Sequence, residues 1–216
     1  MTRPRQGCCR RILGCGLVMS GLLVAVAGPA AGRDRAFRIQ LDRDRPRERL
    51  LIQERPCKVY VGGCSRLILR DGRREAVLTP FTQRPRYPYG WRVRSVRFPD
   101  LTGDGRPEIL WSLATAGGTV SSPSLRGVDQ WNGRRASRIF KFTSRRKPPA
   151  NYIGVVFVKS RVVRGSGSDL PELETREFLL DRNDPNCCPS AYRLIRHRWN
   201  GQRIAPVPGS TRIEPT

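Results

Sequence analysis

Residues 92–111 read RVRSVRFPDLTGDGRPEILW, and the fold prediction starts from this stretch. Its first seven residues place arginines next to mostly apolar side chains, as expected of a strand with one face in water. An Asp-Gly pair at 104–105 follows and favours a tight turn. The run from Glu108 to Trp111 is again typical of a strand. The stretch therefore predicts two strands on either side of an acidic loop.

Short runs of this kind continue along most of the chain. Runs rich in β-branched and aromatic residues are separated by turn residues, and no window keeps a helical period. The runs are residues 58–61, 67–69, 76–78, 92–98, 108–111, 138–142, 152–158, 177–180 and 192–199. We therefore predict a single all-β domain of antiparallel sheets, built from short strands and hairpins and compatible with propeller-blade-like sheets.

A weak internal repeat accompanies these runs. Asp-Gly or Asn-Gly turns before a basic residue have their glycines at Gly72, Gly133 and Gly201, which are 61 and 68 residues apart. The spacing fits three related hairpin units, although so common a turn also recurs by chance. Trp131 and Trp199 stand next to two of these turns. We predict that both tryptophans pack in a core, with carbohydrate stacking as the alternative.

The first 27 residues have the composition of a secretory signal peptide. A basic start is followed by an apolar run from Ile12 to Ala27 and by small residues, so cleavage is expected after Ala27. A retained membrane anchor is disfavoured because the run is shorter than the ~20 apolar residues that span a bilayer. The chain is therefore predicted to be secreted or periplasmic, without a transmembrane segment after cleavage.

The rest of the chain divides into two parts by composition. Residues 28–50 are charge-rich and apolar-poor, and they are expected to form a partly disordered arm. Residues 51–216 are expected to form the β domain, which is long enough for one proper core. The sequence gives no indication of oligomeric state.

The chain is strongly basic and its basic residues are mostly arginine. It has 41 lysines and arginines against 18 acids, a formal charge of +23; removing residues 1–27 takes away four arginines and no acid, which leaves +19. This excess favours an anionic partner, such as an acidic polysaccharide or an envelope surface. The alternative is that the charge only keeps the surface soluble. Nucleic acid is disfavoured by export and by the absence of a recognisable nucleic-acid-binding pattern.

Four cysteines remain after the predicted cleavage, namely Cys57, Cys64, Cys187 and Cys188. An even number in an exported chain predicts disulfide bonds, and three connectivities are open. A zinc site is disfavoured because the spacing lacks a C-x-x-C pair and the only histidine is His197.

The loop from Asp100 to Glu108 carries the clearest chemistry in the sequence. Oxygen-bearing side chains stand at its first, third, fifth and ninth positions, and a glycine follows the fifth. Hard Ca²⁺ prefers such an oxygen cage. The expected ligands are the side chains of Asp100, Thr102, Asp104 and Glu108 and the backbone carbonyl of Arg106. The alternative is a turn whose acids only bind backbone amides.

This loop is not an EF-hand, because Trp111 stands where an EF-hand has its bidentate glutamate. It resembles instead the D-x-[DN]-x-D-G-x-x-[DE] calcium loops of FG-GAP and VCBS-type repeat proteins. That resemblance implies a loop between two strands, with the ninth residue opening the second. Thr102 replaces the usual Asp or Asn, and Arg97 and Arg106 are close in sequence, so weak affinity in the ~10⁻⁴ to 10⁻³ M range is expected.

A second resemblance covers residues 96–207. Asp184-Pro-Asn-Cys-Cys-Pro-Ser190, followed by Tyr192 and by Trp199-Asn-Gly201, is similar to the N-C-C-P-S and W-[DN]-G segment of small secreted bacterial proteins and lipoproteins of the LppP/LprE type. Residues 116–120 also fit the order of segments in that group. The departure is Thr115, where the group has a cysteine. The resemblance implies a shared domain and no known activity.

The sequence contains no convincing catalytic centre. Residues 165–169 lack the order of a G-x-S-x-G nucleophile loop and are predicted to form a Gly/Ser turn. Residues 181–186 are predicted to form Asx turns, and His197 is expected to be a partly exposed strand residue. We therefore expect a non-enzymatic secreted or envelope β protein with a structural calcium loop and a basic surface. The alternative is a hydrolase that acts on an extracellular polymer.

Overall fold

The secondary structure that the chain forms is β throughout the part that can be described. The computed structural model describes residues 34–42, 47–56, 63–79, 90–115, 124–143, 148–165, 167, 169–185 and 188–216. Thirteen strands and no helix lie in these ranges, so the prediction of an all-β fold with short strands is confirmed. None of the same residues forms a helix long and apolar enough to cross a bilayer. The predicted signal peptide, residues 1–27, lies outside them.

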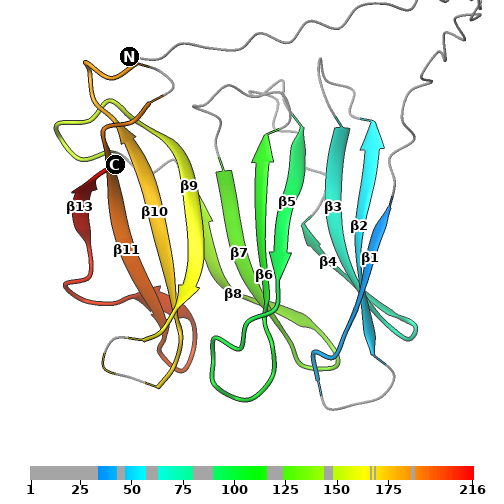
Figure 1. The fold of residues 1–216 in the computed structure, drawn as a ribbon. Helices are drawn as coiled ribbons and strands as arrows, with labels where there is room; N and C mark the ends of the chain where they lie inside the picture. The colour runs from blue at the N-terminus through cyan, green and yellow to red at the C-terminus, as the bar shows by residue number, and fades with distance from the viewer. Residues whose placement is uncertain are drawn as a thin grey trace, which may run out of the picture. The chain divides into compact units, whose positions relative to one another are not determined.

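The strands form three antiparallel sheets in chain order (Figure 1). The first sheet has the order β1-β2-β3-β4, the second β5-β6-β7-β8, and the third β12-β11-β10-β9 with β13 paired to β11. The first four strands of each sheet thus form a meander in which consecutive strands pair, the strand order of a propeller blade. The bounds are β1 (Arg35–Ile39), β2 (Glu48–Pro56), β3 (Gly63–Asp71), β4 (Arg74–Thr79), β5 (Trp91–Arg97), β6 (Ile109–Thr115), β7 (Ser124–Trp131), β8 (Ala136–Thr143), β9 (Gly154–Val163), β10 (Glu172–Leu180), β11 (Ala191–Trp199), β12 (Ile204–Pro206) and β13 (Arg212–Pro215).

The internal repeat is confirmed by the sheet topology. Gly72, Gly133 and Gly201 have φ angles of 54°, 79° and 93°, and each lies in the turn between the third and fourth strands of its sheet. In two of these turns the geometry is the same: the side chain of Asn132 or Asn200 accepts hydrogen bonds from the amides two and three residues later. The three turns therefore occupy the same position in their sheets.

Two hydrophobic cores lie between neighbouring sheets. One is formed by residues of the first and second sheets and contains Trp111 and Trp131, which are 1% and 2% exposed. The other joins the second and third sheets and has Trp199 packed against it. The prediction that both tryptophans next to the turns pack in cores is therefore confirmed. Burial leaves Trp131 no exposed ring face for a sugar.

The boundary of the β domain differs from the expected one. β1 and the first residues of β2 lie within the segment 28–50 that was expected to be a charged arm. The physical reason is a small set of apolar residues among the charges. Leu41 and Leu50 are 1% and 0% exposed and belong to the first core, so they hold this segment on the sheet.

The cysteines are described only in part. Cys64 is buried at the start of β3 and is disulfide-bonded, and Cys188 is exposed. Cys57 and Cys187 lie outside the described residues, as does the predicted run 58–61. The connectivity among the four cysteines therefore stays a prediction.

A buried carboxylate organises the third sheet. The side chain of Glu174 is 1% exposed and accepts hydrogen bonds from Nε of Arg161 at 2.7 Å and Nε of Arg176 at 2.9 Å, with Arg196 at 3.8 Å. Burial raises the pKa of Glu174, but the bonds from Arg161 and Arg176 outweigh burial, so its pKa lies below its ordinary value of 4.5. The carboxylate therefore stabilises the sheet in its ionised form.

Replacing Glu174 with glutamine is expected to reduce the free energy of unfolding at neutral pH by about 1–2 kcal/mol. The loss stays modest because Arg161, 56% exposed, regains water when its partner is neutralised. A depressed pKa contributes stability above the unfolded pKa that is lost as pH falls through the folded pKa. The difference between variant and wild type in urea titrations should therefore shrink as pH falls below 4.5. Glu75→Gln, in an exposed pair with Arg70, is the control and should change stability by less than about 0.5 kcal/mol at any pH. A pH-independent Glu174→Gln loss would contradict the assignment.

Candidate metal centre

The predicted calcium loop lies between β5 and β6 and is closed by its own backbone. The amide of Glu108 donates to the carbonyl of Pro99 at 2.8 Å, at the point where the two strands diverge. Gly103 and Gly105 have φ angles of 76° and 78°, which side chains other than glycine rarely adopt. Two left-handed residues within three positions curl the loop back over its first acid.

Three of the predicted ligands converge. One carboxylate oxygen from each of Asp100, Asp104 and Glu108 lies within 4.8 Å of the other two. Asp100 is half-buried, Asp104 is exposed and Glu108 is fully buried, so the cluster extends from the surface into the protein.

The two aspartates also shape the loop. Oδ1 of Asp100 accepts a hydrogen bond from the amide of Gly103 at 2.7 Å, and Oδ2 accepts one from Gly105 at 2.9 Å. Oδ1 of Asp104 accepts from the amide of Arg106 at 2.8 Å. These bonds are the Asx-type contacts of the metal-free alternative, and they hold both carboxylates facing the inside of the loop.

The side chain of Glu108, which directly precedes β6, binds the first residues of the loop. Its Oε2 accepts from the amides of Leu101 at 2.6 Å and Thr102 at 3.3 Å, and its Oε1 accepts from the Thr102 hydroxyl at 2.9 Å. Leu101 is 1% exposed and belongs to the core between the second and third sheets. The glutamate is therefore a clamp between loop and core, a role that the sequence did not indicate.

The charge state of this clamp depends on its surroundings. Burial raises the pKa of Glu108 above its ordinary value, and the neighbouring charges of Asp100 and Asp104 raise it further. The hydrogen bonds from Leu101 and Thr102 oppose both effects without cancelling them. Three carboxylates in so small a volume repel one another, and a divalent cation among them would remove this repulsion.

The residues present fit a hard cation. A carboxylate offers about four lone-pair sites, so the hydrogen bonds within the loop leave acceptor capacity on all three acids. All donors are oxygen, as Ca²⁺ requires. Thr102 lies beside Glu108 with its hydroxyl oxygen in the same loop. Arg106 was predicted to contribute only its backbone carbonyl, and its amide donates to Oδ1 of Asp104 in the cluster.

The first sheet contains a related clamp that sequence reasoning missed. The amide of Leu41 donates to Oε2 of Glu48 at 2.9 Å, seven residues apart, as Leu101 and Glu108 are. Glu172 is likewise 0% exposed at the start of the second strand of its sheet. In the sequence, a proline stands one or two residues before each of these three glutamates, and this recurrence is the pattern that could have indicated their equivalent positions.

Among the residues that the structure describes, a cluster of three acids is found in the second unit of this repeat. Asp42 and Asp44 stand at the first-unit positions that correspond to Thr102 and Asp104, and Asp44 lies outside the described residues. Gln40 stands at the position that corresponds to Asp100, counting back from the clamping glutamate, and arginines stand where the two glycines are. In the first unit, burial raises the pKa of Glu48, which lies next to Asp42. The related clamps therefore support the fold in more than one sheet, whereas in the described parts of the chain the three-acid cluster lies in one loop.

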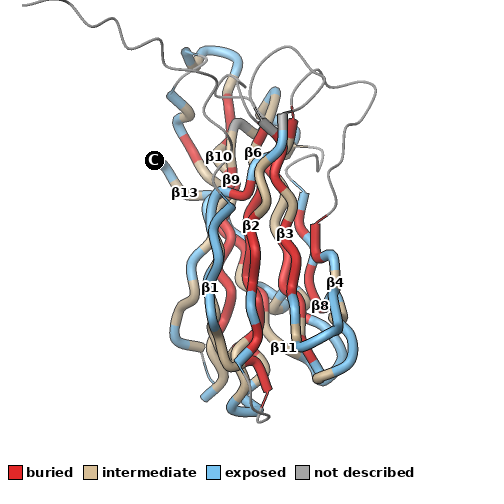
Figure 2. Tube along the Cα trace, turned by 90° about the vertical axis from the view of Figure 1, so that its right-hand side faces the viewer, coloured by how far each residue is buried: buried red, intermediate tan, exposed pale blue. Residues whose placement is uncertain are grey.

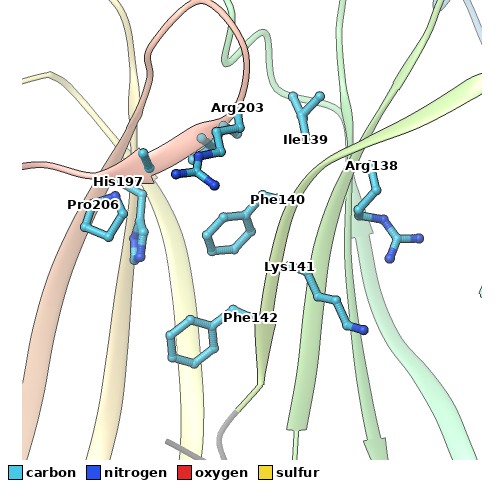
Figure 3. Close-up of a pocket in the computed structure, with 10 residues that line it drawn as sticks. Arg138, Ile139, Phe140, Lys141, Phe142, His197, Arg203 and Pro206 are labelled. Atoms are coloured by element: carbon cyan, nitrogen blue, oxygen red, sulfur yellow. The ribbon is translucent and has the colours of Figure 1, made fainter.

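A cavity of about 370 Å³ lies beside β8 and β12, and His197 is among the residues that line it (Figure 3). If His197 had a catalytic role, its partners would be expected in this cavity. His197 is 2% exposed, not partly exposed as expected, and its Nδ1 lies 3.2 Å from the carbonyl oxygen of Leu173. The rings of Phe140 and Phe142 point toward it, with the Phe140 centroid 5.0 Å away. The described residues that line the cavity include no carboxylate, hydroxyl or thiol.

The remaining sequence candidates behave as structural elements. Oδ2 of Asp184 accepts from the amides of Asp181 and Ser190 and from the Ser190 hydroxyl at 2.8 to 3.0 Å, and Oδ1 of Asp181 accepts from Asn183. The predicted Asx turns are therefore confirmed. The segment 165–169 is described only at Gly165, Gly167 and Asp169, and Gly167 has a φ of 75°.

No protein-family model, curated protein or solved structure matches the chain. The geometry of the loop and the charge of the surface are therefore the observations that bear on function.

Proposed function

We propose that this chain is a secreted or periplasmic, non-enzymatic β protein that holds a structural Ca²⁺ in the loop 100–108 and binds an anionic partner through its basic surface. The observation that carries the proposal is the convergence of Asp100, Asp104 and Glu108 within 4.8 Å on a loop bent by two left-handed glycines. Export rests on the composition of residues 1–27.

The metal's contribution would be to stability. Ca²⁺ accepts six to eight oxygen ligands with little geometric demand, and water completes such a shell where the protein supplies only some of them. The side chains of Asp100, Thr102, Asp104 and Glu108 would hold the ion. Because Leu101 connects this loop to a core, an ion held there would stabilise both the loop and the packing of the second sheet on the third.

The surroundings of His197 weigh against the alternative of a hydrolase. General acid–base or nucleophilic catalysis needs a second titratable or nucleophilic group within hydrogen-bond reach. The cavity next to His197 presents two phenylalanines, aliphatic groups and three basic residues, Arg138, Lys141 and Arg203. In Figure 3 the side chain of Lys141 extends to the far side of β8, away from the histidine.

Calcium is expected to raise the melting temperature of the wild-type protein, and Asp104→Ala is expected to abolish that rise. A concentration ten to a hundred times Kd adds about 1.4–2.7 kcal/mol to the native state, which corresponds to roughly 3–10 °C for a chain of this size. The measurement is a thermal melt with calcium and with chelator.

The matched control is Asp71→Ala, which changes the aspartate of another Asp-Gly turn and lies in the β3–β4 hairpin. This variant should keep the full calcium response. An equal melting temperature of wild type with calcium and with chelator would rule out the calcium part of the proposal. An unchanged response in Asp104→Ala would place the ion elsewhere.

A further inference from the structure

Three arginines lie side by side across the first sheet. In the register of the antiparallel strands, Arg38 of β1 is opposite Arg49 of β2, and Arg49 is opposite Arg70 of β3. Directly opposed residues project to the same face of a sheet. The pairing therefore brings together three cationic side chains that are up to 32 residues apart in the sequence.

These arginines line a cleft of about 620 Å³ together with Arg47 and Gly72. All four arginines are exposed. Arg70 has an acidic partner, Glu75, at 2.8 Å. Across the described ranges of the chain, Arg38, Arg47 and Arg49 form no ion pair. Figure 2 looks onto this sheet, where β1 is exposed along nearly its whole length.

The row of opposed arginines destabilises the sheet by charge repulsion unless an anion binds to it. Like charges directly opposite each other destabilise a sheet, and the forked guanidinium is suited to bidentate contact with carboxylate, sulfate or phosphate groups. By contrast, the carboxylate of Glu174 in the third sheet lies within ion-pair distance of three arginines, at 2.7, 2.9 and 3.8 Å. The buried acid of the first sheet, Glu48, bonds to the amide of Leu41, and no ion pair joins it to these arginines among the described residues.

We propose that this arginine cleft, formed by Arg38, Arg47, Arg49 and Arg70, binds an acidic polysaccharide through its carboxylate or sulfate groups. The inference rests on the proposed function, because it locates the anion-binding surface named there. Neighbouring strands are about 4.8 Å apart, so the cleft presents cations at regular intervals along a line across the strands. A polymer with an anionic group on successive sugars matches such a line.

The lining of the cleft distinguishes this partner from two others. Single-stranded nucleic acid is bound through bases stacked on aromatic side chains, and surface binding to lipid needs apolar side chains that insert among the acyl chains. Among the described residues, those that line the cleft are four arginines and a glycine. They provide charge and hydrogen-bond donors only.

The test compares two double variants of the full protein that remove the same charge. Arg38→Ala/Arg49→Ala removes two arginines of the cleft, and Arg94→Ala/Arg182→Ala removes two exposed arginines outside it. Binding of heparin and of polygalacturonate is measured by titration at low and at physiological ionic strength, with a single-stranded oligonucleotide as competitor. Thermal melts establish that both variants are folded.

Removal of the two cleft arginines should weaken polysaccharide binding about a hundredfold, roughly tenfold for each lost charge-assisted contact. The control variant should lose less than about threefold. Equal losses in the two variants would overturn the cleft as the site and leave the proposed basic surface intact. Absence of binding by the wild type would overturn both. Tighter binding of the oligonucleotide, with the same dependence on Arg38 and Arg49, would overturn the polysaccharide in favour of nucleic acid.

Discussion

Replacing Glu108 with alanine is expected to lower the free energy of unfolding by about 3 kcal/mol and to remove the calcium response together with it. The carboxylate accepts hydrogen bonds from the amides of Leu101 and Thr102 and from the Thr102 hydroxyl. Truncation leaves the buried Leu101 amide without an acceptor, and it also removes the innermost of the three clustered acids. The measurement is urea unfolding with calcium and with chelator.

Glu48→Ala is the matched control for this experiment. Glu48 clamps Leu41 in the first sheet as Glu108 clamps Leu101, but glutamine replaces the aspartate at the first position of its loop and arginines replace both glycines. We expect a similar loss of stability and an unchanged calcium response. If Glu108→Ala instead retained the full response to calcium, the cation would not be held by this loop.

Replacing Trp111 with alanine is expected to cost about 3–5 kcal/mol, the largest effect that we expect of any single substitution in this chain. The side chain is 1% exposed in the core between the first and second sheets. Its Nε1 donates to Oδ2 of Asp129 at 2.6 Å, and Arg138 donates to the other oxygen. Burial raises the pKa of Asp129, so loss of the indole donor removes one of the contacts that keep this acid ionised.

A double-mutant cycle with Gly127 tests the packing that explains this cost. Gly127 lies opposite Trp111 in the register, and a Cβ at this glycine would be 2.7 Å from Cε2 of the indole and nearer still to Cζ2. Gly127→Ala should therefore destabilise the wild type by about 2–3 kcal/mol and have little effect in the Trp111→Ala background. Additive losses in chemical denaturation would show that the ring does not lie over this glycine.

The contact between Trp111 and Gly127 also explains why β7 could not be predicted. Its sequence, SLRGVDQW, has a glycine and an aspartate in the middle and no apolar run, so pattern reasoning passes over it. The glycine is needed because a ring from the neighbouring strand covers it, and the aspartate is buried because an indole and a guanidinium pair with it. Both causes come from other strands.

The loop 100–108 was predictable to a greater extent, because its chemistry is local. Nine consecutive residues contain the acids and the glycines, and backbone geometry over so short a span brings the carboxylates together without help from distant segments. The second role of Glu108 depends on the burial of Leu101 in a core between two sheets. Spacing alone does not reveal that burial.

By itself the sequence determined the class of the fold, the three hairpin turns and the acidic loop, because alternation, Asp-Gly pairs and ligand spacing act between residues that are near neighbours in the chain. Only the tertiary structure decided which strands pair and in what register. That pairing places Arg38, Arg49 and Arg70 in one row and buries Asp129 against Trp111. It also makes part of the charge-rich segment 28–50 form strands. Hydrogen bonding and burial across strands act between residues far apart in sequence, so no local pattern contains them.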